Sequence, residues 1–312
     1  MIARISRRDL LHAGCLTAGA LGVSTLSGTL APVGALAESK SASNSPNAEI
    51  PAPAATADAP VEMFYKDEYF GAPWIKPEPA LLIHGNDEWS VIWNGWVPKM
   101  AQEFRTIRPD MPGFGNSAIP PGFEWTMANL ATVLAHFLDS IGIESVHFIG
   151  AKTGGAIGMQ FAADYPKRTR TLTIVSGPVT PVSSKIAFQA PSPTSQLKRL
   201  GTSAPKEQVE FWNAMMSSTK EETRLGIDKV EKALNMESVL PRITVPTLVI
   251  TADQSGLQSL DTVIAYQRKI ANSRLLVIPS DGYHVAAVKP DECVMNTMSF
   301  IKMTQRSAKT SA

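Results

Sequence analysis

Residues 146–158, VHFIGAKTGGAIG, decide the fold of this chain. They begin with an apolar run typical of a buried strand, pass through a turn flanked by glycines, and end in small residues typical of the start of a helix. Lys152 stands at the apex of the turn. The stretch therefore predicts a strand–turn–helix unit that presents a lysine at the carboxyl end of a strand.

The alternation of strand and helix continues on both sides of this unit. Apolar runs predict further strands at residues 80–83, 104–108, 171–175, 245–250 and 274–278, and periodic apolar residues predict helices at residues 127–141, 259–270 and 290–303. Such alternation is typical of an α/β fold with a mainly parallel sheet covered on both faces.

The alternation is interrupted at about residues 178–242. This segment starts with a Pro/Ser-rich connection and contains two predicted helices, around residues 209–216 and 221–234. We expect it to form a helical lid inserted between two strands.

The composition excludes some classes of partner. Of the 312 residues, 44% are hydrophobic, and 29 Lys and Arg balance 28 Asp and Glu. This balance is typical of a soluble globular protein with one large core, and it gives no reason to expect a nucleic acid partner.

The first residues resemble a targeting signal. SRRDLL at residues 6–11 matches the twin-arginine export pattern, and ALA at residues 35–37 is suitable for cleavage after a mildly apolar stretch. A transmembrane anchor is the alternative, but the stretch is rich in small and polar residues and contains Pro32. We therefore predict that residues 1–37 are a signal peptide and that the protein is periplasmic, with no membrane attachment after cleavage.

The rest of the chain is predicted to contain one domain. Residues 38–60 are dominated by Ser, Ala, Pro and Asn and are expected to be a disordered linker. The domain is expected at residues 61–306 and a tail at residues 307–312. Cys293 is the only cysteine after the signal, so no internal disulfide is expected, and its spacing favours a core position on the last helix.

Four landmarks together resemble the α/β-hydrolase superfamily. They are His84-Gly85 after an early strand, the turn-rich segment at residues 110–117, the turn around Lys152, and His284 before the last helix. The resemblance covers residues 81–301 and implies the α/β-hydrolase fold. In this family the residue at the apex is a nucleophilic serine, cysteine or aspartate. Lys152 departs from that pattern.

The resemblance also implies an oxyanion hole. In the family it is formed by the backbone N–H groups of the residue after the first His-Gly pair and of the residue after the nucleophile. The corresponding residues are Asn86 and Thr153. His284 matches the catalytic histidine. The expected acid aligns with Ser255, whereas Asp253 lies two residues earlier, so either Asp253 or a weaker partner such as Ser255 could orient His284.

The role of Lys152 has three possible explanations. A helix N-terminus and desolvation both lower a lysine pKa, and a neutral amine could form a Schiff base that supports retro-aldol or decarboxylation chemistry. Alternatively, a charged Lys152 could hold a substrate carboxylate or enolate while His284 activates water. The third explanation is a lost active site in a protein that only binds a small ligand.

We therefore expect an exported enzyme that acts on a small apolar carbonyl compound: an ester, a lactone, or an activated C–C bond as in a diketone. Lys152, His284 and the backbone of Asn86 and Thr153 would replace a serine triad. No cofactor and no metal are expected, and the oligomeric state is not predicted. The residues expected to contact the substrate are Trp89, Trp212, Met215 and Met216.

Overall fold

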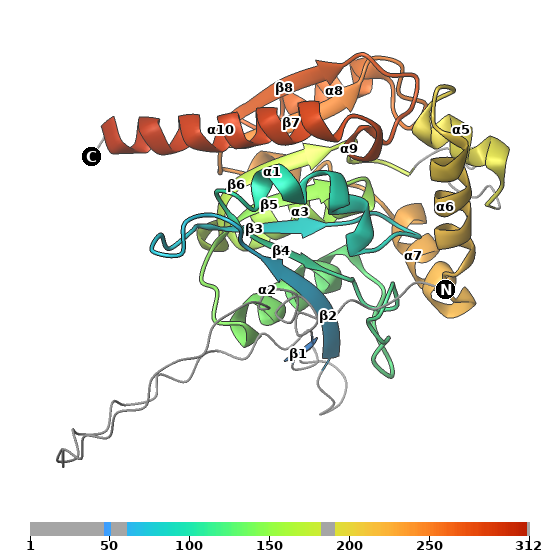
Figure 1. Cartoon of the computed structure of the whole chain (residues 1–312), viewed down its shortest axis with the longest axis horizontal. Coiled ribbons are helices and arrows are strands. Elements are labelled where there is room, and N and C mark those ends of the chain that lie inside the picture. Colours follow the sequence, from blue (N-terminus) through green and yellow to red (C-terminus); the bar gives the residue numbers. More distant parts are fainter. Residues whose placement is uncertain (1–46, 51–60, 182–190, 311–312) are drawn as a thin grey trace, which may run out of the picture. The chain divides into compact units, whose positions relative to one another are not determined.

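The computed structural model describes residues 47–50, 61–181 and 191–310 (Figure 1). The strands are β1 (Asn47–Ile50), β2 (Val61–Glu68), β3 (Pro79–Ile83), β4 (Arg105–Pro109), β5 (Val146–Ala151), β6 (Thr169–Val175), β7 (Thr247–Ala252) and β8 (Ser273–Ile278). The helices are η1 (Ser90–Gly95), α1 (Val97–Met100), α2 (Met127–Ser140), α3 (Thr153–Asp164), η2 (Pro166–Arg168), α5 (Pro193–Leu200), α6 (Lys206–Ser217), α7 (Glu221–Lys232), η3 (Leu240–Arg242), α8 (Leu260–Gln267), α9 (Val285–Val288) and α10 (Pro290–Thr310).

The strands form a single sheet in the part of the chain that is described. Their order is β1-β2-β4-β3-β5-β6-β7-β8. The pairs β1–β2 and β2–β4 are antiparallel, and all pairs from β4 to β8 are parallel. Because parallel strands share one carboxyl edge, the loops after β3, β5, β6, β7 and β8 converge on the same side of the sheet.

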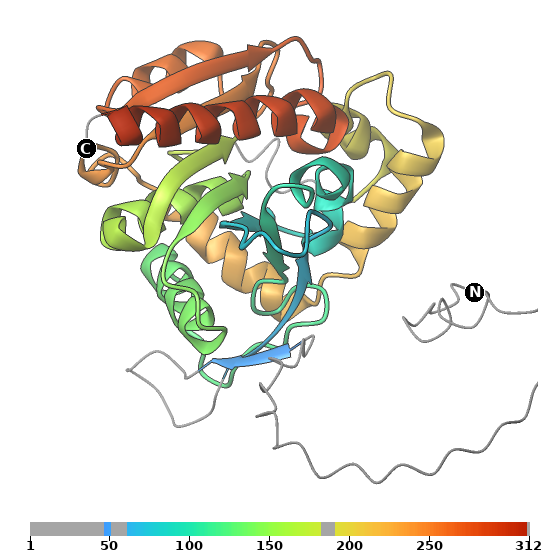
Figure 2. The same cartoon turned by 60° about the vertical axis from the view of Figure 1, so that its left-hand side comes forward.

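The alternation of side chains along each strand creates two cores. In β3, Leu81 and Ile83 pack on one face while Ala80 and Leu82 pack on the other. Apolar residues of α2, α3 and α8 cover the first face, and those of η1, α1, α9 and α10 cover the second (Figure 2). This double cover explains why neighbouring residues on opposite faces of β3, such as Leu81 and Leu82, are both apolar.

Within the described residues, the segment between β6 and β7 carries three α-helices and the short η3. Figure 1 shows α5, α6 and α7 beyond the arrowheads of the parallel strands, where the loops converge. Helices α6 and α7 were predicted, but α5 was not. Its N-cap is Ser192, which forms a reciprocal capping pair with Ser195. This short-range signal for the start of a helix lies within a Ser/Pro-rich stretch, which was predicted to be a connection.

The six predicted strands are present as β3 to β8, and the α/β-hydrolase fold is confirmed. Cys293 is buried in the second core, as predicted, and Trp93 and Trp96 are buried there too. Two predicted boundaries are wrong. Strand β1 falls inside the segment predicted to be a disordered linker, because it pairs with β2, and α10 continues to Thr310, through most of the predicted tail. The predicted signal peptide lies outside the described residues.

Candidate active site

The turn between β5 and α3 holds Lys152 in an unusual backbone conformation. Its φ is 53° and its ψ is −122°, a region that non-glycine residues occupy at a cost of about 1–3 kcal/mol. A Cβ on Gly150 would lie 2.2 Å from the carbonyl oxygen of Gly154, and a Cβ on Gly154 would lie 2.3 Å from the carbonyl oxygen of Ile83. The two glycines are therefore required by close backbone contacts, and the turn places the Lys152 side chain at the carboxyl edge of the sheet.

Lys152 is paired with a buried glutamate that the sequence did not predict. Its Nζ donates to Oε1 of Glu88 at 2.7 Å, and both side chains are almost completely buried. The same oxygen accepts a hydrogen bond from Arg199 Nη1 at 3.0 Å and lies 2.9 Å from His284 Nε2. Glu88 comes from the loop after β3, Arg199 from α5 and His284 from the start of α9. Three basic side chains from distant parts of the chain thus converge on one carboxylate oxygen.

These contacts shift the pKa values of the cluster. Burial acts to raise the pKa of Glu88, but His284 and Lys152 outweigh it and hold this pKa well below its usual range. Burial lowers the pKa of His284, although Glu88 opposes the shift. Burial and then the charge of Arg199 lower the pKa of Lys152, while the contact with Glu88 favours the charged amine. The basic neighbours of Glu88 therefore favour its ionised form, whereas burial acts against a charge on His284.

His284 is oriented differently from the prediction. Asp253 accepts a hydrogen bond from the backbone of Ser280, and Ser255 accepts one from the backbone of Leu257. Within the described residues neither side chain contacts His284, and His284 Nδ1 has no hydrogen-bond partner. The expectation that Asp253 or Ser255 orients His284 is therefore wrong, because the carboxylate beside this imidazole is that of Glu88.

The two residues expected to form the oxyanion hole lie together. Thr153 is the first residue of α3, so its N–H is one of the four that have no partner within the helix. A second buried glutamate links it to Asn86. Thr153 Oγ1 donates to Glu231 Oε1 at 2.6 Å, and Asn86 Nδ2 lies 3.5 Å from Glu231 Oε2. Burial raises the pKa of Glu231, and the hydrogen bond from Thr153 opposes this. Glu231 comes from α7 and was not predicted.

The four residues predicted to contact substrate are mostly core residues. Trp212, Met215 and Met216 are buried, and Trp89 is half-buried against the second core. The ring of Trp212 lies edge-on to His284, with 6.2 Å between the ring centroids. Trp212 therefore supports the imidazole, and contact of the four residues with a substrate stays a prediction.

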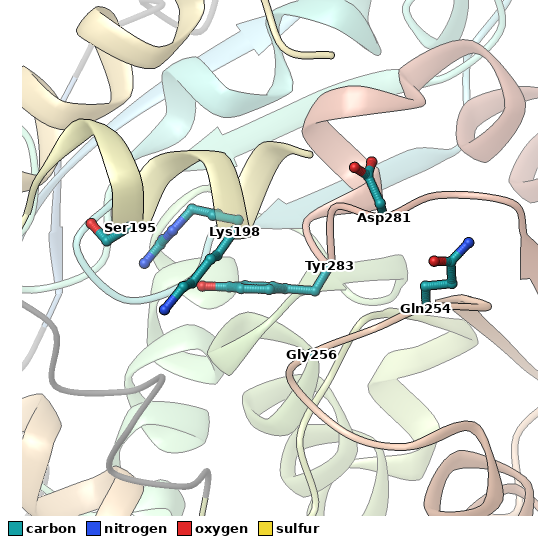
Figure 3. A pocket seen from close by; sticks show the side chains of 7 residues that line it. Ser195, Lys198, Gln254, Gly256, Asp281 and Tyr283 are labelled. Atoms are coloured by element: carbon teal, nitrogen blue, oxygen red, sulfur yellow. The ribbon is translucent and has the colours of Figure 1, made fainter. Parts of the chain in front are cut away.

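A cavity of about 210 Å³ lies next to this cluster. It is lined by Ser195, Lys198, Arg199, Gln254, Gly256, Asp281 and Tyr283 (Figure 3). Arg199 contacts Glu88, and Tyr283 precedes His284, so the wall of the cavity is continuous with the cluster. The wall combines polar and charged groups with apolar surface, whereas we expected a largely apolar site.

Two features are absent from the described residues. They contain no group of three or more His, Cys, Asp or Glu side chains that could hold a metal ion. No helix among them combines the length and the apolar character needed to cross a membrane.

The fold of this chain is similar to that of known proteins. Residues 79–225 match the family model described as alpha/beta hydrolase fold. The chain has the α/β-hydrolase fold, and solved structures share it. The enol-lactonase of Burkholderia xenovorans superposes with a TM-score of 0.69 at 19% identity, covering 78% of this chain and 97% of that one. An esterase of Thermogutta terrifontis superposes with a TM-score of 0.67 at 21% identity, covering 83% and 98%.

A curated relative is similar over a shorter stretch. The 2-hydroxy-6-oxo-2,4-heptadienoate hydrolase of Pseudomonas putida is 32% identical over 100 residues, which are 31% of this chain and 36% of the relative. The matched stretch thus spans about a third of that protein.

Proposed function

We propose that this protein is an enzyme that hydrolyses an ester, a lactone or an activated C–C bond of a small carbonyl compound without a serine nucleophile. The observation that carries the proposal is the convergence of Lys152, Arg199 and His284 on Glu88 at 2.7–3.0 Å. A site that had only lost its nucleophile would not need a buried carboxylate to hold the residue that replaced it. The helices α5 and α7, which contribute Arg199 and Glu231, would act as the lid.

The contact with Glu88 favours a charged Lys152. A protonated amine has no lone pair and cannot attack a carbonyl group, so it acts as a fixed positive charge. We infer that it stabilises negative charge on the substrate during the reaction. The Schiff-base alternative is favoured by the burial of Lys152 and by Arg199, both of which lower its pKa.

His284 is the base in this proposal. Glu88 Oε1 lies 2.9 Å from Nε2, which favours a proton on Nε2 and leaves the lone pair on Nδ1. The imidazole takes a proton from water while the water oxygen attacks the carbonyl carbon. The oxyanion that forms is held by the N–H groups of Asn86 and Thr153. The C–O or C–C bond then breaks, and the leaving group takes the proton from the imidazolium.

The test is a panel of small esters, lactones and diketones, assayed with the native protein, with His284→Ala and with Lys152→Met. We expect turnover by the native protein and a loss of about 10²–10⁴-fold in kcat/KM for His284→Ala, because a general base contributes this much. Lys152→Met keeps a similar length without the charge and should also lose activity. No turnover of any substrate, or full activity in both variants, would refute the proposal.

Trapping with borohydride separates the two roles of Lys152. A charged anchor gives no adduct with carbonyl compounds, whereas a Schiff base gives a reduced adduct that mass spectrometry locates on Lys152. Lys152→Ser supplies a second readout. A gain of esterase activity in this variant would show that the oxyanion site and His284 can serve a serine nucleophile.

We also propose that the protein is exported and that residues 1–37 are removed. The support is the twin-arginine pattern at residues 6–11, followed by a cleavage site of small residues. The test is fractionation of cells that express the native chain or an Arg7→Lys, Arg8→Lys variant. We expect periplasmic protein only from the native chain. If the native chain and the variant are distributed in the same way between periplasm and cytoplasm, export by this signal is contradicted.

A further inference from the structure

One buried side chain on the wall of the cavity has an unused donor. Arg199 is 7% exposed, and its Nη1 donates to Glu88. Its Nε is buried and has no hydrogen-bond partner within the described residues. Buried polar atoms are nearly always paired, so a buried guanidinium with an unpaired N–H indicates a missing acceptor.

The charge around Arg199 also indicates what is missing. Lys152, Arg199 and His284 all lie against one carboxylate oxygen of Glu88. The three basic groups therefore share this oxygen, and a further anion beside Arg199 would be held by charge-assisted hydrogen bonds.

The cavity itself has two different ends. Figure 3 shows Ser195 and Lys198 on α5 at one end, Asp281 and Gln254 at the other, and the Tyr283 ring between them. Lys198 adds a second cation beside Arg199. Asp281 is negative, but its Oδ2 already accepts hydrogen bonds from the backbone N–H and the hydroxyl of Thr202. The end near α5 thus favours a carboxylate, and the opposite end offers an amide and a carboxylate that can bind a hydroxyl group.

We propose that this cavity binds a small hydroxy acid or keto acid, with its carboxylate on Arg199 and Lys198. This inference rests on the proposed function and names the class of substrate or product that the site takes. The guanidinium would use Nε and a second N–H to hold the carboxylate, since this fork matches the two oxygens. The volume of about 210 Å³ leaves room for a short acid.

The matched probes are 2-hydroxybutanoate and its neutral amide, 2-hydroxybutanamide. They have the same shape and differ in the charge that Arg199 and Lys198 would bind. We expect isothermal titration calorimetry on the native protein to show binding of the acid at least ten times tighter than binding of the amide. Equal affinity, or no binding of the acid, would overturn the proposal.

Three variants locate the binding. Arg199→Gln is expected to weaken binding of the acid at least tenfold, and Lys198→Gln by about threefold to tenfold. Lys206→Gln is the control, because this exposed lysine of α6 pairs with Glu210 and does not line the cavity. Unchanged affinity in a folded Arg199→Gln variant would refute the assignment. If the Arg199→Gln variant fails to fold, unchanged affinity for the acid in the Lys198→Gln variant would refute the assignment instead.

Binding is measured without turnover, so the two proposals can fail separately. Tight binding of the acid with no activity on any carbonyl substrate would remove the proposed reaction and keep the anion site. Turnover together with equal affinity for the acid and the amide would keep the reaction and remove the anion site.

Discussion

Replacement of Glu88 by glutamine tests the central ion pair most directly. The substitution preserves shape and one acceptor oxygen but removes the only clear anion between Lys152, Arg199 and His284. Two unit charges 2.7 Å apart attract each other by roughly 6 kcal/mol at an effective dielectric constant of about 20, and the desolvation of both groups cancels part of this. Loss of one partner of a buried ion pair typically costs about 3–5 kcal/mol. We expect Glu88→Gln to lower the free energy of unfolding by about 3–5 kcal/mol.

The assay is urea unfolding at pH 7, analysed with a common m-value for the native protein and the variant. The control is the double variant Glu88→Gln, Lys152→Met, in which the lysine charge is removed as well. Since the two groups are in contact, we expect the double variant to be more stable than the sum of the single losses predicts, by about 0.5–3 kcal/mol. A loss below about 1 kcal/mol for Glu88→Gln, or additive losses in the double variant, would refute an ion pair that holds the site together.

Three further predictions concern the same region. The pKa of Glu231 is raised in the folded protein, so its contribution to stability is complete below about pH 4.5 and is lost as the pH rises from there through the raised pKa. Glu231→Gln should remove this part of the pH dependence of the free energy of unfolding in urea. If the free energy of unfolding changes with pH in the same way in the native protein and the variant, the prediction is contradicted. Gly154→Ala forces a Cβ to 2.3 Å from the Ile83 carbonyl oxygen, so it should unfold at clearly lower urea than the matched helix variant Gly158→Ala, whose new Cβ meets only side chains. Phe148→Ala removes a fully buried ring of β5 and should cost about 3–5 kcal/mol in the same assay, a value below 1 kcal/mol being incompatible with this packing.

The fold could be predicted because it depends on patterns that are local in the sequence. Strand β5 is mostly apolar because it is buried on both faces, and α2 shows a clear three- and four-residue period because only one of its faces is buried. The helix region ends at Gly142, whose φ is 68°, and this end could also be predicted from the sequence. Strand β1 could not be predicted, because four residues in a Ser/Ala/Pro-rich segment show no periodicity that would indicate their pairing with β2.

The site was predicted only in part, because only some of its residues lie in patterns that are local in the sequence. Lys152 and His284 lie at motif positions, so their proximity follows from the fold. Glu88 and Arg199 lie at no motif position, and the 111 residues between them give no local signal that they meet. The only cue was Glu88 itself, a charged residue placed directly between the expected oxyanion segment and the buried η1.

The glycines on either side of the apex carry information about the fold. The side chain at the apex and the groups that it contacts carry information about the chemistry. Gly150 and Gly154 are required by contacts between backbone atoms, and these contacts are the same whatever side chain stands at residue 152. The glycine pattern can therefore persist when the nucleophile is replaced, and it gives no evidence for a serine-type reaction. What distinguishes this chain is that a buried carboxylate at 2.7 Å accompanies the lysine. A buried cation at the apex needs such a partner, and Glu88 supplies it.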